Sequence, residues 1–437
     1  MTHAYPGRLA EFARARWREL AASSNPGPCD PQGAVLPEPE AFEQLLSIAY
    51  QASLLQEEER PVRFRLLVGD PARLPLGVGP PAGLHCLRFA QSRRYDEHEI
   101  SRLAPAAKFT RALIGVRSVG ESFEIWGMLQ SGPRWLQSAR GGRPLPSPVP
   151  SDAVVVRVVG PGRLAVALGE VILAELRGGQ LQTGTMDVFE SNWLSSRFVR
   201  LRTELLAEHD EAMRGRGAAP LDPNVTRKIA QQMVKRLIAT MRDAHHGGTL
   251  LLVSRERAAS LVEEGGTIRL KYAFTDEEPR RRYRSLILAV MRELALGADR
   301  AAGPVGWDTY RASTRPAIVS LDEAILEMSQ LLAALGEVDG AVLLTDSFEI
   351  LGFGGEIVGN MREIRSVRHA LDLEGTSSEE VPIDHVGTRH RSAYRLCAQE
   401  PSAIAIVVSH DGGVQFVASR DGTTTYWEHV PVTGAEV

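Results

Sequence analysis

Two clusters near the C-terminus combine residue types that bind phosphate and divalent cations. The first is Asp339-Gly340-Ala341, and the second is Gly387-Thr388-Arg389-His390-Arg391-Ser392-Ala393. Arginine presents a planar fork of N–H donors that matches phosphate oxygens, and it stays charged at any cellular pH. Packing two such charges beside an imidazole costs repulsion unless an anion lies among them. The second cluster therefore predicts a polyphosphate site.

The position of Asp339 suits a ligand of a hard cation. Helical periodicity covers 321–335, and the apolar run 342–344 is typical of a buried strand, so Asp339 falls on the short turn where that strand begins. Gly340 has no side chain, which lets a ligand or another backbone approach closely. A carboxylate on such a turn can hold a cation through oxygen.

A third segment adds further polar groups. The apolar run 403–408 predicts another buried strand, and the turn that follows it contains Ser409, His410 and Asp411. We expect the three segments to meet at one cleft of triphosphate size. The alternative is that 389–391 is a solvated surface turn paired with local carboxylates.

In this order, and each beside an apolar run, these motifs resemble the diadenylate cyclase (DAC) domain family, whose members join two ATP molecules into cyclic di-AMP. The run 249–253, which follows two glycines, is typical of another buried strand. A helix followed by a glycine and an apolar strand opens the fold of that family, so the resemblance extends back to about Asn224. It implies a mixed sheet flanked by helices and a metal-dependent nucleotidyltransferase that uses Mg²⁺ or Mn²⁺. Each domain would bind one ATP, which implies a head-to-head homodimer or higher homo-oligomer.

The resemblance also assigns roles to individual residues. Asp339 would hold the metal ion and orient the 3′-hydroxyl, while Asp411 is the candidate second carboxylate for the metal. The predicted catalytic residues are Asp339, Gly340, Arg389, His390 and Arg391, the last three as phosphate ligands. The other predicted ATP contacts are Ala341, Phe353, Gly354, Gly355, Glu356, Gly387, Thr388 and Ser409, of which 353–356 would contact the base.

Two features depart from the family pattern. His410 stands where many members carry an acidic residue, and the segment from Gly352 to Gly387 is longer than usual. The histidine leaves open an alternative function, a DAC-like fold that binds nucleotide and reports on it without cyclising it. As a long mobile loop, this segment would either gate entry to the site or restrict the pairing of two domains.

Composition narrows the classes of protein to which the chain can belong. Its 437 residues are 43% hydrophobic and 24% charged, which is typical of two or three globular domains. A net charge of −4 lacks the basic surplus of a polynucleotide-binding protein. The three cysteines are far apart in the sequence, and no apolar run approaches the ~20 residues that span a bilayer. We therefore expect a cytoplasmic protein with no membrane segment and no long nucleic acid as a partner.

The pattern of elements predicts an α/β (α+β) chain in four parts. These are an N-terminal helix and linker (1–36), a smaller mixed α+β domain (37–183), a helical connector (184–223) and the DAC-like nucleotide-binding domain (224–437). The stretches 52–64, 103–106 and 125–127 resemble the module DACNV, regarded as a sensor that accompanies some DAC domains. That resemblance implies an unknown small-molecule signal. It also leaves open an interaction protein whose N-terminal half is the working part.

Overall fold

The structure is a computed structural model of the whole chain. It describes residues 3–23, 29–74, 84–109, 111–120, 122–130, 143, 149–169, 171–182, 186–244, 246–359, 361, 363–410 and 412–429. The chain forms two compact units: the first takes in the described residues up to 130 and 149–182, and the second takes in 143 and 186–429. The segment 184–223, predicted as a connector, thus belongs to the second unit as far as it is described.

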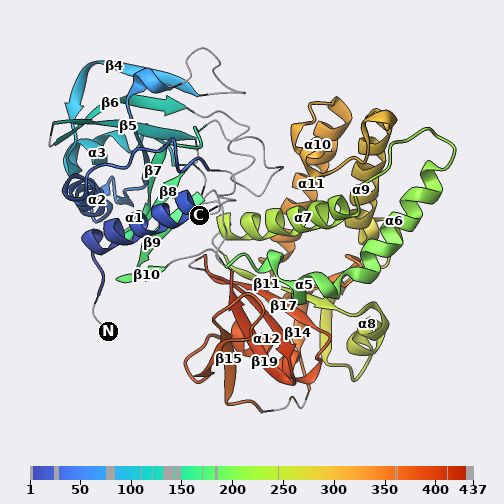
Figure 1. The fold of residues 1–437 in the computed structure, drawn as a ribbon. Helices are drawn as coiled ribbons and strands as arrows, with labels where there is room; N and C mark the ends of the chain where they lie inside the picture. Colours follow the sequence, from blue (N-terminus) through green and yellow to red (C-terminus); the bar gives the residue numbers. More distant parts are fainter. Residues whose placement is uncertain are drawn as a thin grey trace. The chain divides into compact units, whose positions relative to one another are not determined.

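The first unit is an eight-stranded sheet with helices packed on one face (Figure 1). The strand order is β10-β9-β8-β7-β3-β5-β6-β4, in which the central pair β3 and β5 is parallel. The elements are α1 Pro6–Ala22, α2 Pro39–Ser53, β1 Gln56–Glu57, β2 Arg60–Pro61, β3 Phe64–Val68, β4 His85–Arg94, α3 Glu97–Leu103, β5 Ala112–Val119, β6 Ser122–Gln130, β7 Val154–Gly160, β8 Arg163–Leu168, β9 Val171–Arg177 and β10 Gln180–Gln182.

Alternating strand residues give this sheet two apolar faces. Leu66 and Ile114 pack with the helices, whereas Leu67 and Leu113 face the opposite side together with Trp126. The indole N–H of Trp126 donates to the carbonyl of Gly69 at 3.0 Å. Trp126 is therefore a core residue with its one polar atom satisfied.

The second unit is built on a nine-stranded mixed sheet, which confirms the predicted fold class. Its strand order is β12-β14-β13-β11-β17-β18-β19-β15-β16. The elements are η2 Val188–Glu190, α5 Asn192–Arg197, α6 Val199–Met213, α7 Pro223–Asp243, β11 Gly248–Val253, α8 Arg255–Val262, β12 Ile268–Ala273, α9 Glu277–Leu296, η3 Arg300–Ala302, α10 Trp307–Ala312, α11 Pro316–Leu335, β13 Ala341–Thr345, β14 Ile350–Ile357, β15 Ser366–Ala370, β16 Ser378–Pro382, α12 Thr388–Gln399, β17 Ile404–Val408, β18 Val414–Arg420 and β19 Thr423–Glu428.

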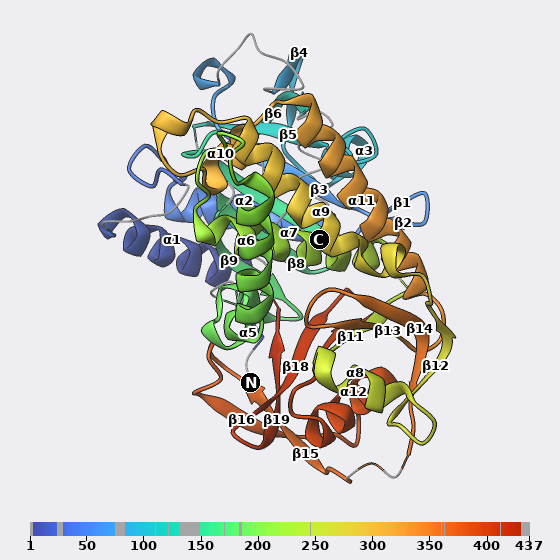
Figure 2. The same cartoon turned by 90° about the vertical axis from the view of Figure 1, so that its right-hand side faces the viewer.

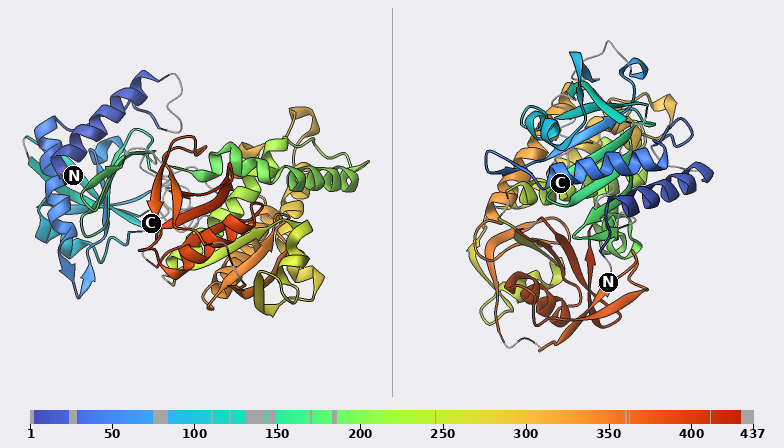
Figure 3. Two further views of the ribbon diagram at one scale, coloured as in Figure 1. Left: turned by 90° about the horizontal axis from the view of Figure 1, so that it is seen from below. Right: turned by 90° about the vertical axis from the view of Figure 1, so that its left-hand side faces the viewer.

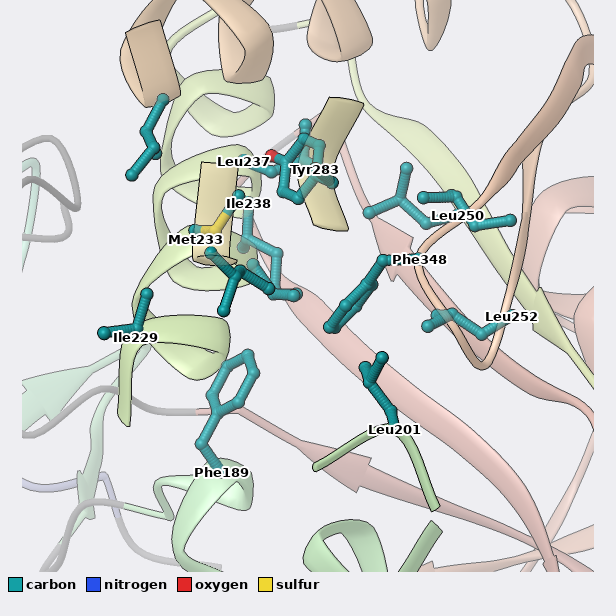
Figure 4. Packing of buried hydrophobic residues seen from close by; sticks show 14 of the residues in the cluster. Phe189, Leu201, Ile229, Met233, Leu237, Ile238, Leu250, Leu252, Tyr283 and Phe348 are labelled. Carbon is teal, nitrogen blue, oxygen red and sulfur yellow. The ribbon is translucent and has the colours of Figure 1, made fainter. Parts of the chain in front are cut away.

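Helices cover both faces of this sheet (Figure 2). Along β11, Leu250 and Leu252 pack against α7, α9 and α11, and Figure 4 shows them with Met233, Leu237 and Phe348. The intervening Leu251 and Val253 pack on the other face against α8 and α12. In both views of Figure 3 the orange-red helix α12 lies against the red strands. A strand buried on both faces reads as an unbroken apolar run, as the sequence predicted.

The helices at the start of the second unit are anchored to its sheet. The carboxylate of Glu374 accepts hydrogen bonds from the backbone N–H groups of Asn192 at 2.7 Å and Trp193 at 3.3 Å, where it caps α5. Trp193 also stacks on Trp427 with ring centroids 4.3 Å apart. The segment predicted as a connector is thus part of the hydrophobic core. None of the described helices is both long and apolar enough to cross a membrane.

We predict that a buried histidine makes the second unit less stable in acid. Burial lowers the pKa of His429 to about 4, with Asp187 opposing and Lys235 and Arg242 reinforcing the shift, and its Nδ1 accepts from the N–H of Val188 at 3.3 Å. Between pH ~6.5 and ~4 this histidine is protonated in the unfolded chain but neutral in the folded unit. The free energy of unfolding therefore falls as the pH drops, and this group contributes at most about 3 kcal/mol to the fall.

Urea denaturation at several pH values, followed by tryptophan fluorescence, measures this dependence. The control is His429→Gln, which keeps a hydrogen-bond acceptor but does not titrate. The variant should lose much of the decline between pH ~6.5 and ~4. An unchanged decline in the variant would assign the acid sensitivity to other groups.

Candidate active site

Sheet topology brings the predicted segments to one end of the second unit. Strand β11 runs parallel to β13, with Leu250 opposite Val342, and antiparallel to β17, with Gly248 opposite Val408. The start of β11, the start of β13 and the end of β17 therefore lie at the same edge. Helix α12 precedes β17 and packs along it, so its N-terminus returns to that edge as well.

The Arg-His-Arg run occupies the first turn of α12. Gly387 is the N-cap residue, and the first backbone bond of the helix runs from the N–H of Arg391 to the carbonyl of Gly387 at 3.1 Å. The helix forms because Ala393, Tyr394, Leu396 and Cys397 are buried on one face. The N–H groups of 388–390 have no intrahelical acceptor, and the positive end of the helix dipole adds to the charge of the arginines. Such a helix start binds anions.

The three side chains of this run point in different directions, because successive helical residues are about 100° apart. Arg389 Nη1 donates to the carbonyl of His246 at 3.1 Å, and His390 Nε2 lies 3.4 Å from the hydroxyl of Ser409. Arg391 Nη2 donates to the carbonyl of Val386 at 3.1 Å. Arg389 and His390 line the cleft at this edge, whereas Arg391 is not among its lining residues.

Gly340 fixes the opposite wall. Its φ of +119° is in the region that favours glycine, and a Cβ atom there would lie 2.5 Å from the carbonyl carbon of Gly354. The backbone before β13 thus touches the backbone of β14 directly, and this contact sets the position of the exposed Asp339. The sequence predicted a close backbone approach at Gly340 but did not identify the partner.

One cleft of about 730 Å³ contains both walls. From the predicted site it takes in Asp339, Gly340, Ala341, Gly355, Glu356, Gly387, Thr388, Arg389, His390 and Ser409. It also includes Ser392, Ala393, Val407, Val408 and His410, which belong to the predicted segments but were assigned no ligand contact. Thr249, Ile357 and Val358 were not indicated as site residues by the sequence. Asp411, the predicted second metal ligand, lies outside the described residues. The carboxylate of Asp339 and the cationic helix start therefore share one hollow.

The predicted base-binding stretch is divided between two faces of the sheet. Gly355 and Glu356 line the cleft. Phe353 lies elsewhere, because it stacks on Tyr272 with ring centroids 4.6 Å apart and packs against the core under α9. Gly354 lies behind Gly340 as part of the backbone contact.

Two cations on the edge strand β12 hold Glu356 in its ionised form. Lys271 Nζ lies 2.9 Å from the Glu356 carboxylate, and Arg269 pairs with the same group. These hydrogen bonds lower the pKa of Glu356 to about 2. Lys271 also donates to the backbone carbonyl of Asp339 at 3.5 Å. The alternation of Arg269 and Lys271 along one strand face was the only sequence signal for this contribution.

The side chains at the cleft suit a cation that would be held partly by the protein and partly by the phosphates of a ligand. Among the described residues, no three His, Cys, Asp or Glu side chains gather into a ready-made metal site. Asp339 supplies one carboxylate at the cleft, and Glu356 is engaged by Lys271 and Arg269. Mg²⁺ is commonly bound through one or two carboxylates plus substrate phosphates rather than by a cage of protein ligands.

Comparison with known proteins yields one match, which lies in the first unit. Residues 31–130 match the family described as "Probable sensor domain DACNV". This stretch contains α2, α3 and β1 to β6, and the match supports the predicted N-terminal sensor module. Neither the curated proteins nor the solved structures contain a protein that matches the chain.

We predict that Gly340→Ala destabilises the second unit. The new methyl group would collide with the backbone of Gly354, and alanine would be strained at this φ, so the expected cost is about 1–3 kcal/mol. The thermal midpoint should fall by roughly 2–10 °C. The matched control is Gly387→Ala on the opposite wall, where φ is −63° and no atom lies within 4 Å of the new methyl group. Equal midpoints for the two variants would contradict the backbone contact.

Proposed function

We propose that the second unit is a diadenylate cyclase domain and that the first unit is its sensor. The domain condenses two ATP molecules into cyclic di-AMP and releases two pyrophosphates. The supporting observation is the cleft lined by Asp339 on one wall and by the first turn of α12, with Arg389, on the other. The match of 31–130 supports the sensor assignment, because the DACNV module accompanies domains of this kind. In this assignment the sensor's signal is a small molecule.

The reaction needs positioning and charge neutralisation more than covalent participation by the protein. Each ribose 3′-oxygen forms a bond to the α-phosphorus of the other nucleotide while the bond between that phosphorus and the pyrophosphate breaks. The two hydroxyl protons are released. The helix start and Arg389 bind the phosphates, and Ser409 orients His390 toward them. Gly340 lets the wall that carries Asp339 pack directly on the backbone of β14.

Asp339 has two functions in this proposal. It accepts a hydrogen bond from the 3′-hydroxyl and so orients the attacking oxygen, and it is the carboxylate that would hold Mg²⁺ or Mn²⁺. A divalent cation at this position supplies neutralisation of the charge on the phosphates. The absence of a multi-carboxylate site among the described residues agrees with a cation bound between protein and nucleotide.

The proposal requires two clefts that face each other. The described residues of one chain supply one Asp-Gly-Ala wall and one helix start, and therefore one phosphate site. Two ATP molecules must exchange bonds symmetrically, so the active species is a twofold pair of second units. The assembly is a homodimer or a higher homo-oligomer.

A binding protein without turnover is the second candidate. His410 lines the cleft where the family pattern has an acidic residue, so the chain carries one potential metal-binding carboxylate fewer. Such a protein would bind ATP and return it unchanged. An assay for cyclic di-AMP formed from ATP distinguishes the two functions.

We predict that the protein forms cyclic di-AMP from ATP with Mg²⁺ or Mn²⁺ and that Asp339→Asn abolishes this activity. The amide cannot hold the cation or the 3′-hydroxyl in the same way, so turnover should drop by roughly 100-fold or more. The control is Asp308→Asn, because the side chain of Asp308 is 97% exposed on α10. Chromatographic detection of the cyclic product measures both variants. Full turnover by Asp339→Asn would remove this assignment, and wild-type ATP binding without product would favour the second candidate.

We further predict that the two arginines of α12 differ in their contribution to ATP binding. Arg389 lines the cleft, so Arg389→Ala should weaken ATP binding by roughly 10- to 100-fold, the value of a charge-assisted hydrogen bond. Arg391 donates to the carbonyl of Val386, so Arg391→Ala should weaken it by less than about threefold. Isothermal titration with a non-hydrolysable ATP analogue gives both affinities. A larger loss for Arg391→Ala would show that this side chain turns into the cleft.

A further inference from the structure

A second, smaller pocket lies on the other side of His390 from the cleft. Its volume is about 190 Å³, and it is enclosed by α12 and by strands β15, β16, β18 and β19. Part of its wall comes from the β15–β16 hairpin, which belongs to the segment that is longer than in the family pattern. We call it the hairpin pocket. It shares Gly387 and His390 with the cleft, so the two hollows adjoin at the phosphate-binding turn.

The size of the hairpin pocket suits one ring system and not a whole nucleotide. Sites that enclose a complete small-molecule ligand have volumes of roughly 300–1,000 Å³. At about 190 Å³ the hairpin pocket is smaller than that range, whereas the adjoining cleft at about 730 Å³ lies within it. A ligand in the hairpin pocket would therefore be one end of a molecule whose remainder lies in the cleft.

The walls of the pocket suit a flat heterocycle. Val367, Val381 and Val386 form the aliphatic part. Tyr394 and Tyr426 form the aromatic part, with ring centroids 5.8 Å apart and planes 24° from parallel. Aliphatic and aromatic surfaces together provide the kind of contact on which nucleobases pack, whatever their sequence.

Polar groups at the pocket can form hydrogen bonds with a ligand, and nearby carboxylates disfavour a phosphate there. The hydroxyl of Tyr394 donates to Oε1 of Gln415 at 2.9 Å, which orients the Gln415 amide at the pocket wall. Burial raises the pKa of Tyr426 to about 12, and the nearby charges of Glu428 and Glu379 add to this shift. His369 stacks on Tyr426 and bonds to Glu379 at 3.0 Å. A negative surround disfavours phosphate and favours a ring that carries N–H donors.

The two hollows together have the order of groups found in a dinucleotide. The cleft offers one wall for a base, at Gly355 to Val358, and the helix start offers a phosphate site. The hairpin pocket then offers a second ring-sized site beyond His390. ATP has one base and leaves one of these two sites empty. A molecule with two bases joined through phosphates fills both.

We propose that the hairpin pocket binds the second nucleobase of an adenine dinucleotide whose phosphates lie at the first turn of α12, so that a single chain retains the reaction product. This proposal rests on the proposed cyclase function. It makes the product a competitor of ATP, because both occupy the phosphate site at Gly387 and His390.

The proposal is tested by filling the hairpin pocket with a larger side chain. Val381→Trp places a large ring in the hollow from β16, whereas the control Arg368→Trp places the same ring at an exposed position on the neighbouring strand β15. Isothermal titration of the full chain with cyclic di-AMP should give one ligand per chain for the wild type and the control. Val381→Trp should bind cyclic di-AMP roughly tenfold more weakly or worse, and a non-hydrolysable ATP analogue within about threefold of wild type.

A second variant tests the hairpin pocket independently, in case Val381→Trp does not fold. Gln415→Met keeps the side-chain length but removes the amide, and it should weaken cyclic di-AMP binding selectively in the same way. Binding of one cyclic di-AMP per two chains by the wild type, equal losses for both ligands, or no loss in either variant would each overturn the proposal. Failure of the cyclase function is separate, because it appears as a wild-type protein that forms no cyclic di-AMP.

Discussion

The pairing of β11 with β13 on one side and β17 on the other is the constraint on which the site depends. Because β13 is parallel to β11 and β17 is antiparallel to it, the beginning of one neighbour and the end of the other meet at the same edge. That arrangement places Asp339, some fifty residues before Arg389 in sequence, on the wall opposite the start of α12. Apolar side chains on both faces hold the register, since a slip by one residue would exchange the two buried faces of β11.

Electrostatics then distinguish the two walls. One wall carries the carboxylate of Asp339, and the other carries a helix N-terminus whose N–H groups, dipole and Arg389 all favour an anion. Lys271 and Arg269 on β12 pair with the ionised Glu356, so their two positive charges exceed its one negative charge beside the cleft. A cation at Asp339 and an anion at the start of α12 would be complementary, which is why we propose a metal-associated polyphosphate as the ligand of this edge.

Much of this arrangement followed from sequence, and the remainder depended on contacts between distant segments. The apolar runs around Leu250, Leu343 and Ile406 indicated buried strands, and the glycine at 340 indicated a close approach. The helical state of 388–399 was not predicted, because the helix starts without a side-chain cap and its charged first turn masks the apolar face that follows. That omission made the three cationic side chains look equivalent. Phe353 was expected at the base because the resemblance places the start of this segment in the adenine pocket. The pairing of β13 with β14 shifts register near Leu343, and a period-two pattern does not reveal such a shift.

A crystal structure of the protein with Mg²⁺ and a non-hydrolysable ATP analogue would show whether Asp339 and α12 bind one polyphosphate between them. We expect a triphosphate between Asp339 and the first turn of α12, with the cation between the Asp339 carboxylate and the phosphates and the base against Gly355 to Val358. A nucleotide bound at any other place, or phosphates directed away from α12, would contradict it.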